Sequence, residues 1–309
     1  QMIGLVINNP WDMLYYNLSG TPSLPNPPHP PVPPNYVPQW QVFFQAVNPS
    51  DFPGLIPNPD QYAGDFGGTA MYMRKNHPMN PNIYYSDADW ISEMQRLNYP
   101  NYQGNPVTEP LRRGDLVLVQ AKAPGMFFRG KRNINEMHNT HPDYDFYITI
   151  LARNVPLTAP TITLADLKNP DDTFKFDQTR QTGCERYQGS LVHLQNLLLV
   201  DPHNWALDGT VTVKQRVGQV DLTFPLKLGI DPGLMAINAS VLATTPFSLT
   251  AILDQEDSAS PFTDNYRLWL TSVSDLGAAF AMVPEPASLA LLSVGIALLW
   301  IWRRYWRRG

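Results

Sequence analysis

The sequence of 309 residues contains a single cysteine, so no disulfide can form within the chain. Cys184 lies between Gly183 and Glu185, a context with no group that would lower its pKa, and we predict an inert thiol. The chain begins at Gln1 without the charged and apolar segments of a signal peptide. We expect either that a signal peptide has been removed or that the chain is a fragment, and the sequence leaves both open.

Charged residues are also scarce. They make up 16% of the chain, against about 25% in average soluble domains, whereas hydrophobic residues make up 43%. This composition is rich enough in apolar residues to build a core. A balance so poor in charge is typical of an extracytoplasmic protein.

The standard catalytic motifs are missing as well. None of the six histidines belongs to a HExxH motif, and the chain has neither a GxSxG motif nor a phosphate-binding glycine loop. One group could bind a metal: Glu136, His138 and His141, followed by Asp143 and Asp145. It allows a metal-dependent hydrolase as an alternative, but its turn-forming residues favour a solvated loop. We therefore predict a non-catalytic protein without a cofactor.

Two further acidic stretches, Asp171-Asp172 and Asp254 to Asp257, lack the spacing of an EF-hand loop. We interpret both as charged turns rather than as calcium sites.

Proline, in contrast, is abundant, with 31 residues. Many of them lie between Pro22 and Pro38, where the chain should adopt an extended, polyproline-like conformation. We assign residues 1–38 to an N-terminal segment and proline-rich linker.

Short alternating segments dominate the rest of the chain and predict a mostly β protein. The first half offers strands near residues 40–46, 69–73, 114–121, 130–136 and 145–151, with a helix over 87–97. The second half offers 191–200, 210–213, 222–228, 247–253 and 266–270. Five strands in about ninety residues fit a small barrel, so we expect two such barrels in tandem.

The segments RRGDLVLVQA and GKRNINE, and later YQGSLVHLQNLLLVD and the stretch from Phe247 to Leu276, resemble the OB-fold domains of secreted bacterial proteins. The resemblance implies OB-like domains at 39–155 and 183–277, joined by a linker at 156–182 with a short helix at Leu164–Lys168. OB barrels often bind oligonucleotides or oligosaccharides.

Three features follow one another in the C-terminal tail, residues 283–309. Val283-Pro284-Glu285-Pro286 is held extended by its prolines. Residues 287–302 carry no charge and would reach about 24 Å as a helix, short but sufficient to span a membrane. The basic end should remain on the cytoplasmic side and consists of Arg303, Arg304, Arg307 and Arg308.

This arrangement resembles the PEP-CTERM sorting signal. The resemblance implies an exosortase-like membrane protease as partner, transient or permanent anchoring in the inner membrane with the body outside, and a destination in the cell envelope or extracellular matrix.

Removal of the four tail arginines leaves 18 basic residues against 27 acidic ones if the cut follows Glu285, a net charge of about −9. A body of this charge repels a phosphate backbone. The exception is a basic patch made of Arg112, Arg113, Arg129, Lys131 and Arg132. It keeps nucleic-acid binding as an alternative, but we interpret it as a solvated surface. We therefore predict an exported binding or structural module whose partners are polysaccharide or protein.

Overall fold

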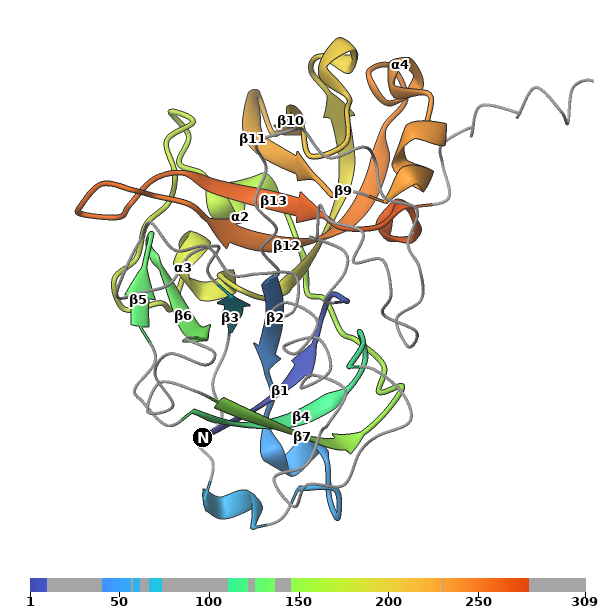
Figure 1. The fold of residues 1–309 in the computed structure, drawn as a ribbon. Coiled ribbons are helices and arrows are strands. Elements are labelled where there is room, and N and C mark those ends of the chain that lie inside the picture. Colours follow the sequence, from blue (N-terminus) through green and yellow to red (C-terminus); the bar gives the residue numbers. More distant parts are fainter. Residues whose placement is uncertain are drawn as a thin grey trace, which may run out of the picture.

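The computed structural model describes residues 1–9, 41–56, 58–61, 67–73, 111–121, 126–136, 146–229 and 231–277. Within these residues the strands form two sheets, one from each half of the chain (Figure 1). The prediction of a mostly β protein is confirmed. The proline-rich segment, the helix expected over 87–97 and the C-terminal tail lie outside the described residues.

The first sheet has seven strands in the order β5-β6-β3-β2-β1-β4-β7. Its neighbouring strands are antiparallel, apart from β3 and β6, which run parallel. The strands are β1 (Met2–Val6), β2 (Gln41–Ala46), β3 (Gly68–Met73), β4 (Leu116–Ala121), β5 (Met126–Phe128), β6 (Lys131–Glu136) and β7 (Phe146–Ala152). Short 3-10 turns follow β2 at Pro49–Asp51 and Pro59–Gln61.

Strand β1 corrects the assignment of residues 1–38 to a segment outside the domains. It lies between β2 and β4, and Ile3, Leu5 and Val6 are buried. Asn8, just beyond it, is also buried, with its Nδ2 donating to the Gln41 carbonyl at 2.9 Å. A strand buried on both faces has no polar alternation, which is why the pattern did not reveal it.

The second sheet contains β8 (Thr161–Ile162), β9 (Leu191–Leu199), β10 (Thr210–Val217), β11 (Val220–Leu228), β12 (Phe247–Gln255) and β13 (Tyr266–Leu270). All five strands predicted in this half are confirmed. The sheet order is β10-β11-β13-β12-β9-β8, and an additional pairing joins β9 to β10. This pairing closes β9, β10, β11, β13 and β12 into a five-stranded barrel, in which β11 and β13 run parallel.

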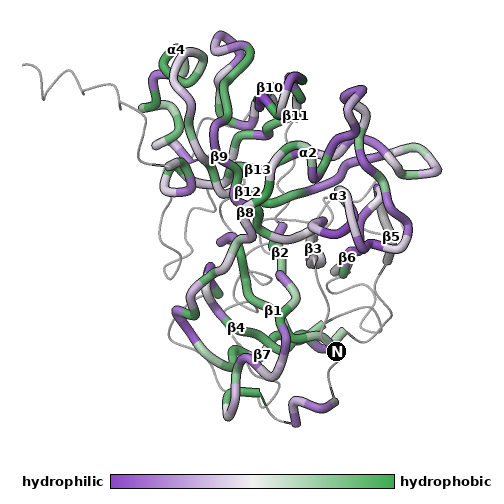
Figure 2. Tube along the Cα trace, turned by 180° about the vertical axis from the view of Figure 1, so that it is seen from behind, coloured by the Kyte–Doolittle hydropathy of each residue, from purple (hydrophilic) through white to green (hydrophobic). Residues whose placement is uncertain are grey.

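The barrel core follows from strand alternation. Along β11 the side chains of Leu222, Phe224, Leu226 and Leu228 are buried, whereas the residues between them are partly exposed. Most buried apolar residues of the barrel strands belong to one cluster, and the others pack against the first half at the junction. In Figure 2, hydrophobic residues also run along β1 and β4 of the first half.

The sequence predicted that residues 156–182 form a linker between two domains. In the structure this segment is instead part of the second half. Strand β8 pairs with β9, and α2 (Leu164–Leu167) places Leu164 and Leu167 in the barrel core. The Leu164 backbone N–H also donates to Gln215 Oε1 at 2.6 Å. The short helix was therefore predicted correctly, but its apolar face is part of the barrel.

The remaining helices of the second half are α3 (Gly183–Tyr187) and α4 (Ala239–Leu242), with 3-10 turns at Pro202–Asn204, Pro232–Ala236 and Val273–Asp275. The turn at Pro232–Ala236 and helix α4 lie between β11 and β12 and bury Leu234 and Leu242.

The two halves share one strand order. In the first half β1, β2, β3 and β6 pair in sequence, just as β9, β10, β11 and β13 do, and the third and last members of each set run parallel. In the barrel β12 pairs with β9 at one end and with β13 at the other. In the first half β4 pairs with β1, and β5 pairs with β6. Strands β4 and β5 together therefore take the place of β12.

Candidate functional site

The two halves meet in a tight junction of backbone and apolar side chains. Gly68 at the start of β3 donates its N–H to the Gln188 carbonyl at 2.8 Å, and a Cβ atom on Gly68 would lie 2.1 Å from the Gly189 carbonyl oxygen. Beside this contact Phe43 of β2 packs edge-on against Trp269 of β13, with ring centroids 6.4 Å apart. The halves are thus docked closely enough for side chains from both to line one site.

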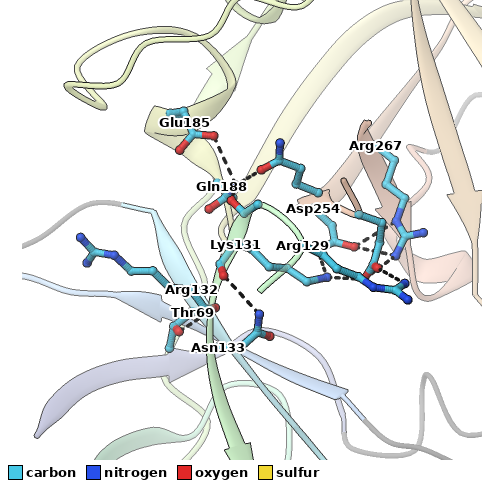
Figure 3. Close-up of polar contacts among 12 residues, drawn as sticks. Thr69, Arg129, Lys131, Arg132, Asn133, Glu185, Gln188, Asp254 and Arg267 are labelled. Atoms are coloured by element: carbon cyan, nitrogen blue, oxygen red, sulfur yellow. Dashed lines mark hydrogen bonds and ion pairs between the residues drawn. The ribbon is translucent and has the colours of Figure 1, made fainter. Parts of the chain in front are cut away.

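Buried charges reinforce the junction (Figure 3). Lys131 Nζ of β6 donates to Asp254 Oδ1 at 2.7 Å and to Glu256 Oε1 at 2.5 Å. Asp254, at the end of β12, is fully buried and also accepts two hydrogen bonds from the Arg267 guanidinium, at 2.9 and 2.7 Å. Burial opposes ionisation of Glu256, but the charges of Lys131 and Arg267 outweigh it and lower its pKa to about 2.

This network accounts for most of the predicted basic patch. Arg113 forms two hydrogen bonds of 2.7 Å with the Asp275 carboxylate, and Arg129 pairs with Glu256 at 3.0 Å. Together with Lys131, three members of the patch therefore bind carboxylates of the second half. The interpretation as a solvated surface is wrong for Lys131, which is buried, and for Arg113, which is largely covered, whereas Arg129 pairs with Glu256 but stays exposed at the surface.

The predicted acidic turns have structural partners too. Asp257 accepts hydrogen bonds from the backbone N–H groups of Ala259 and Asp264, both at 3.1 Å. Asp171 accepts from Thr173, and Asp172 accepts from Thr223 of β11. The prediction of a turn is confirmed at Asp171-Asp172, but the second stretch begins inside β12, where Asp254 is buried, and only its end around Asp257 lies in the loop that follows.

A cavity of about 420 Å³ opens beside the junction. Arg132 of β6 lines it from the first half. The segment before α3 contributes Phe176, Gln178 and Arg180, and the loop between β12 and β13 contributes residues 261–263. Its volume falls within the usual range of small-ligand sites, about 300 to 1,000 Å³.

Glu185 and Gln188 line the buried side of this cavity, which we call the junction pocket. Tyr266 donates its hydroxyl hydrogen to Glu185 Oε1 at 2.5 Å. Burial raises the pKa of Glu185 in spite of this bond and of the charges of Arg180 and Arg132. Burial and the bond to Glu185 raise the pKa of Tyr266. The pocket therefore combines two guanidinium groups with a carboxyl group whose charged form is disfavoured.

Cys184 lies next to Glu185 but faces the barrel core. It is fully buried, its thiol donates to the Leu167 carbonyl at 3.2 Å, and burial raises its pKa. Its geometry thus opposes formation of a thiolate at neutral pH.

Most of the residues that the sequence predicts as site residues lie outside the described part of the chain. Val283, Pro284, Glu285 and Pro286 lie outside it, as do Arg303, Arg304, Arg307 and Arg308. Of the proposed metal ligands, Glu136 ends β6, whereas His138 and His141 lie outside the described residues. Among those that are described, no three His, Cys, Asp or Glu side chains form a group that could hold a metal ion.

Sequence reasoning missed the junction pocket. Its lining comes from three segments around residues 132, 176–188 and 261–263. Each segment by itself looks like an ordinary polar strand or turn, and no motif links them. Folding of the second half brings two of these segments together, and docking of the first half adds Arg132.

Comparison with known proteins identifies one region. Residues 283–308 match the PEP-CTERM protein-sorting motif, which confirms the predicted sorting tail. No curated protein and no solved structure matches the chain. Among the described helices, none has the length and apolar character needed to cross a membrane.

Proposed function

We propose that the chain is an exported protein, sorted by an exosortase-like protease to the cell envelope or extracellular matrix, whose body is a non-catalytic binding module. The sorting motif at residues 283–308 carries the first part of this proposal, because such a motif implies export and membrane-associated sorting. The uncharged segment 287–302 and the basic end at Arg303, Arg304, Arg307 and Arg308 are those expected of an anchor in the inner membrane.

Two OB-like units form the body in this proposal. Support comes from the strand order that both halves share, with the parallel pairs β3–β6 and β11–β13, and from the closure of the second half into a five-stranded barrel. OB folds are five-stranded Greek-key barrels that serve mainly as binding scaffolds.

The junction pocket is the binding site that the described residues support best. Both halves line it, and the tight contact between Gly68 and Gly189 keeps its walls in place. A rigid site of this kind suits recognition, since little conformational entropy is lost on binding. A polysaccharide or a protein remains the class of partner that the acidic body favours.

Nucleic acid is disfavoured by a specific observation. Three of the five residues of the predicted basic patch, Arg113, Arg129 and Lys131, bind Asp275, Glu256 and Asp254 at the junction. Because these side chains are neutralised by carboxylates, they offer little positive charge to a phosphate backbone.

Cleavage of the C-terminal tail tests the proposal that an exosortase-like protease sorts the chain. The chain, placed behind a secretion signal, would be expressed in a host with an exosortase and in the same host without the protease gene. We expect a mature protein shortened near Glu285 and Pro286 only in the first host, as measured by intact mass. A Glu285→Ala chain should keep its tail, and Asp221→Ala serves as the matched control because it removes an exposed surface carboxylate outside the motif.

An identical mass in both hosts would contradict sorting by exosortase and leave the tail as a plain membrane anchor. That outcome would not affect the binding role of the body.

A further inference from the structure

We propose that the junction pocket binds an acidic sugar, with Arg132 and Arg180 holding its carboxylate. This inference deepens the proposed binding function and rests on it. It follows from three properties of the pocket: its positive charge, its neutral hydrogen-bonding groups and its exposed aromatic surface.

The positive charge comes from both halves. Arg132 lies on β6 next to Lys131, but successive strand residues point to opposite sides, and in Figure 3 its side chain extends away from the Lys131 network. Arg180 adopts a left-handed backbone conformation, φ +60°, and its guanidinium lies against the backbone of Gly67. Both residues line the cavity, and their charges act on Glu185 against the opposing charge of Asp177, so a carboxylate in the pocket has two guanidinium groups as candidate partners.

Glu185 does not cancel this charge as an exposed carboxylate would. It is buried beneath the pocket and its Oε1 accepts the hydrogen bond from Tyr266. The guanidinium of Arg180 uses Nε for the Glu185 backbone carbonyl at 3.4 Å. A guanidinium carries five donors in a planar fork, so an arginine with a structural bond can also bind a carboxylate.

The rest of the lining matches the body of a sugar. Gln178 and Thr263 offer an amide and a hydroxyl, which can exchange hydrogen bonds with sugar hydroxyls. Phe176 is 39% exposed, and an exposed ring in a pocket wall can cover the apolar face of a sugar. An inorganic anion would use only the arginines, whereas an acidic sugar uses all three kinds of group.

The charge of the whole body sharpens the choice. With 18 basic and 27 acidic residues after loss of the tail, the body repels polyanions on average. The pocket, which is lined by two arginines, is then a local exception on a body of negative net charge, and it suits one carboxylate at a time. A single acidic sugar unit, either free or within a polymer of low charge density, is repelled less by the acidic body than a densely charged polymer.

The test is calorimetric titration of the full chain in mild detergent with glucuronate, and separately with glucose and with inorganic phosphate. We expect glucuronate to bind with a dissociation constant on the order of 1 mM, which is ordinary for a ligand of this size, and at least tenfold more tightly than glucose. An oligosaccharide that contains one uronate should bind more tightly than the monosaccharide if the natural ligand is a polymer, and equally if it is the free sugar.

Two variants from different halves locate the site. Arg180→Gln and Arg132→Gln should each weaken glucuronate binding at least tenfold and leave the weak glucose signal unchanged. Arg180→Lys should recover part of the affinity, because it keeps the charge but loses the fork. Arg216→Gln is the matched control: Arg216 lies on β10, is exposed and pairs with Asp221, so its loss should leave binding unchanged.

The proposal is overturned if glucuronate binds no better than glucose or if both pocket variants bind like the unmodified chain. Phosphate that binds as tightly as glucuronate would reduce the site to a simple anion pocket and reject the sugar. Near-ultraviolet circular dichroism of every variant identifies loss of folding, and the Arg132 and Arg180 variants provide independent answers if one of them unfolds. None of these outcomes depends on tail processing.

Discussion

The two halves of the molecule share a strand order but differ in how one strand is built. In the second half β12 is continuous over nine residues and pairs with both β9 and β13. In the first half β4 and β5 divide this task, and Lys122-Ala123-Pro124-Gly125 stands between them in the sequence.

The difference extends to the cores. The barrel buries most of its apolar residues in one cluster, whereas the described residues of the first half divide theirs between two clusters, with a third shared across the junction. A half with a divided core gains more from docking than a half with a core of its own. We therefore expect the barrel to stabilise the first half, and the junction to be the point where this dependence can be broken.

The largest effect should come from the barrel core. Phe224 is fully buried and packs edge-on against Phe174, with ring centroids 5.4 Å apart, so Phe224→Ala should lower the free energy of unfolding by about 4 kcal/mol. Phe44→Ala, at an equally buried position of β2, should cost about 3 kcal/mol, because a smaller cluster collapses more readily. Urea unfolding followed by tryptophan fluorescence measures both, and a larger loss for Phe44 would contradict the comparison.

Loss of the buried cation at the junction should have the next largest effect. Lys131→Met leaves Asp254 buried with Arg267 as its remaining cation among the ion pairs described, and should cost about 3 kcal/mol. The exposed pair of Arg216 and Asp221 supplies the control, since Arg216→Met should cost no more than about 1 kcal/mol. If the junction couples the halves, the Lys131 variant should unfold in two steps, and a single step at the original midpoint would argue against coupling.

A methyl group between the halves should separate them with a smaller loss. Gly68→Ala would place Cβ 2.1 Å from the Gly189 carbonyl oxygen, and moving two backbones apart should cost about 2 kcal/mol. Gly218→Ala meets no atom within 4 Å and should cost only about 1 kcal/mol, through its positive φ of +61°. Limited proteolysis should detect opening of the junction in the first variant but not in the second.

The smallest effect is a dependence on pH. The pKa of Glu256 is lowered to about 2 in the folded chain, so the unfolded chain binds its proton first as the pH falls. The stabilising contribution is complete above about pH 4.5 and is lost as the pH falls from about 4.5 toward 2. Denaturation at a series of pH values should show this loss, and Glu256→Gln should remove it.

Glu185 should titrate with the opposite sign. Its pKa is raised by burial, so the folded chain keeps the proton longer and loses stability as the pH rises above the ordinary value of a glutamate. Glu185→Gln should therefore gain stability relative to the unmodified chain at neutral pH but not in acid. A constant difference across the pH range would show that Glu185 does not titrate in this way.

Particular residues show what could be read in advance. The alternation of Leu222, Phe224, Leu226 and Leu228 predicted β11, and similar patterns predicted the other barrel strands. The sequence pattern did not predict strand β1, because a strand with both faces buried has no alternation of apolar and polar residues. It did not predict β8 either, because two residues are too few to form a pattern. The pocket was not predicted because Arg132 of the first half comes close to the segment of Arg180 and Glu185 only when the two halves dock.

The sequence by itself determined the strands of the barrel and the sorting tail, because both depend on local order: alternation along a strand and three motifs along one segment. The tertiary structure decided which charged side chains pair with one another. Arg113 and Lys131 resembled a surface patch in sequence, but the folded chain pairs Arg113 with Asp275 and Lys131 with Asp254. Pairing between residues more than a hundred positions apart leaves no local pattern, since it arises only from the way the two halves pack.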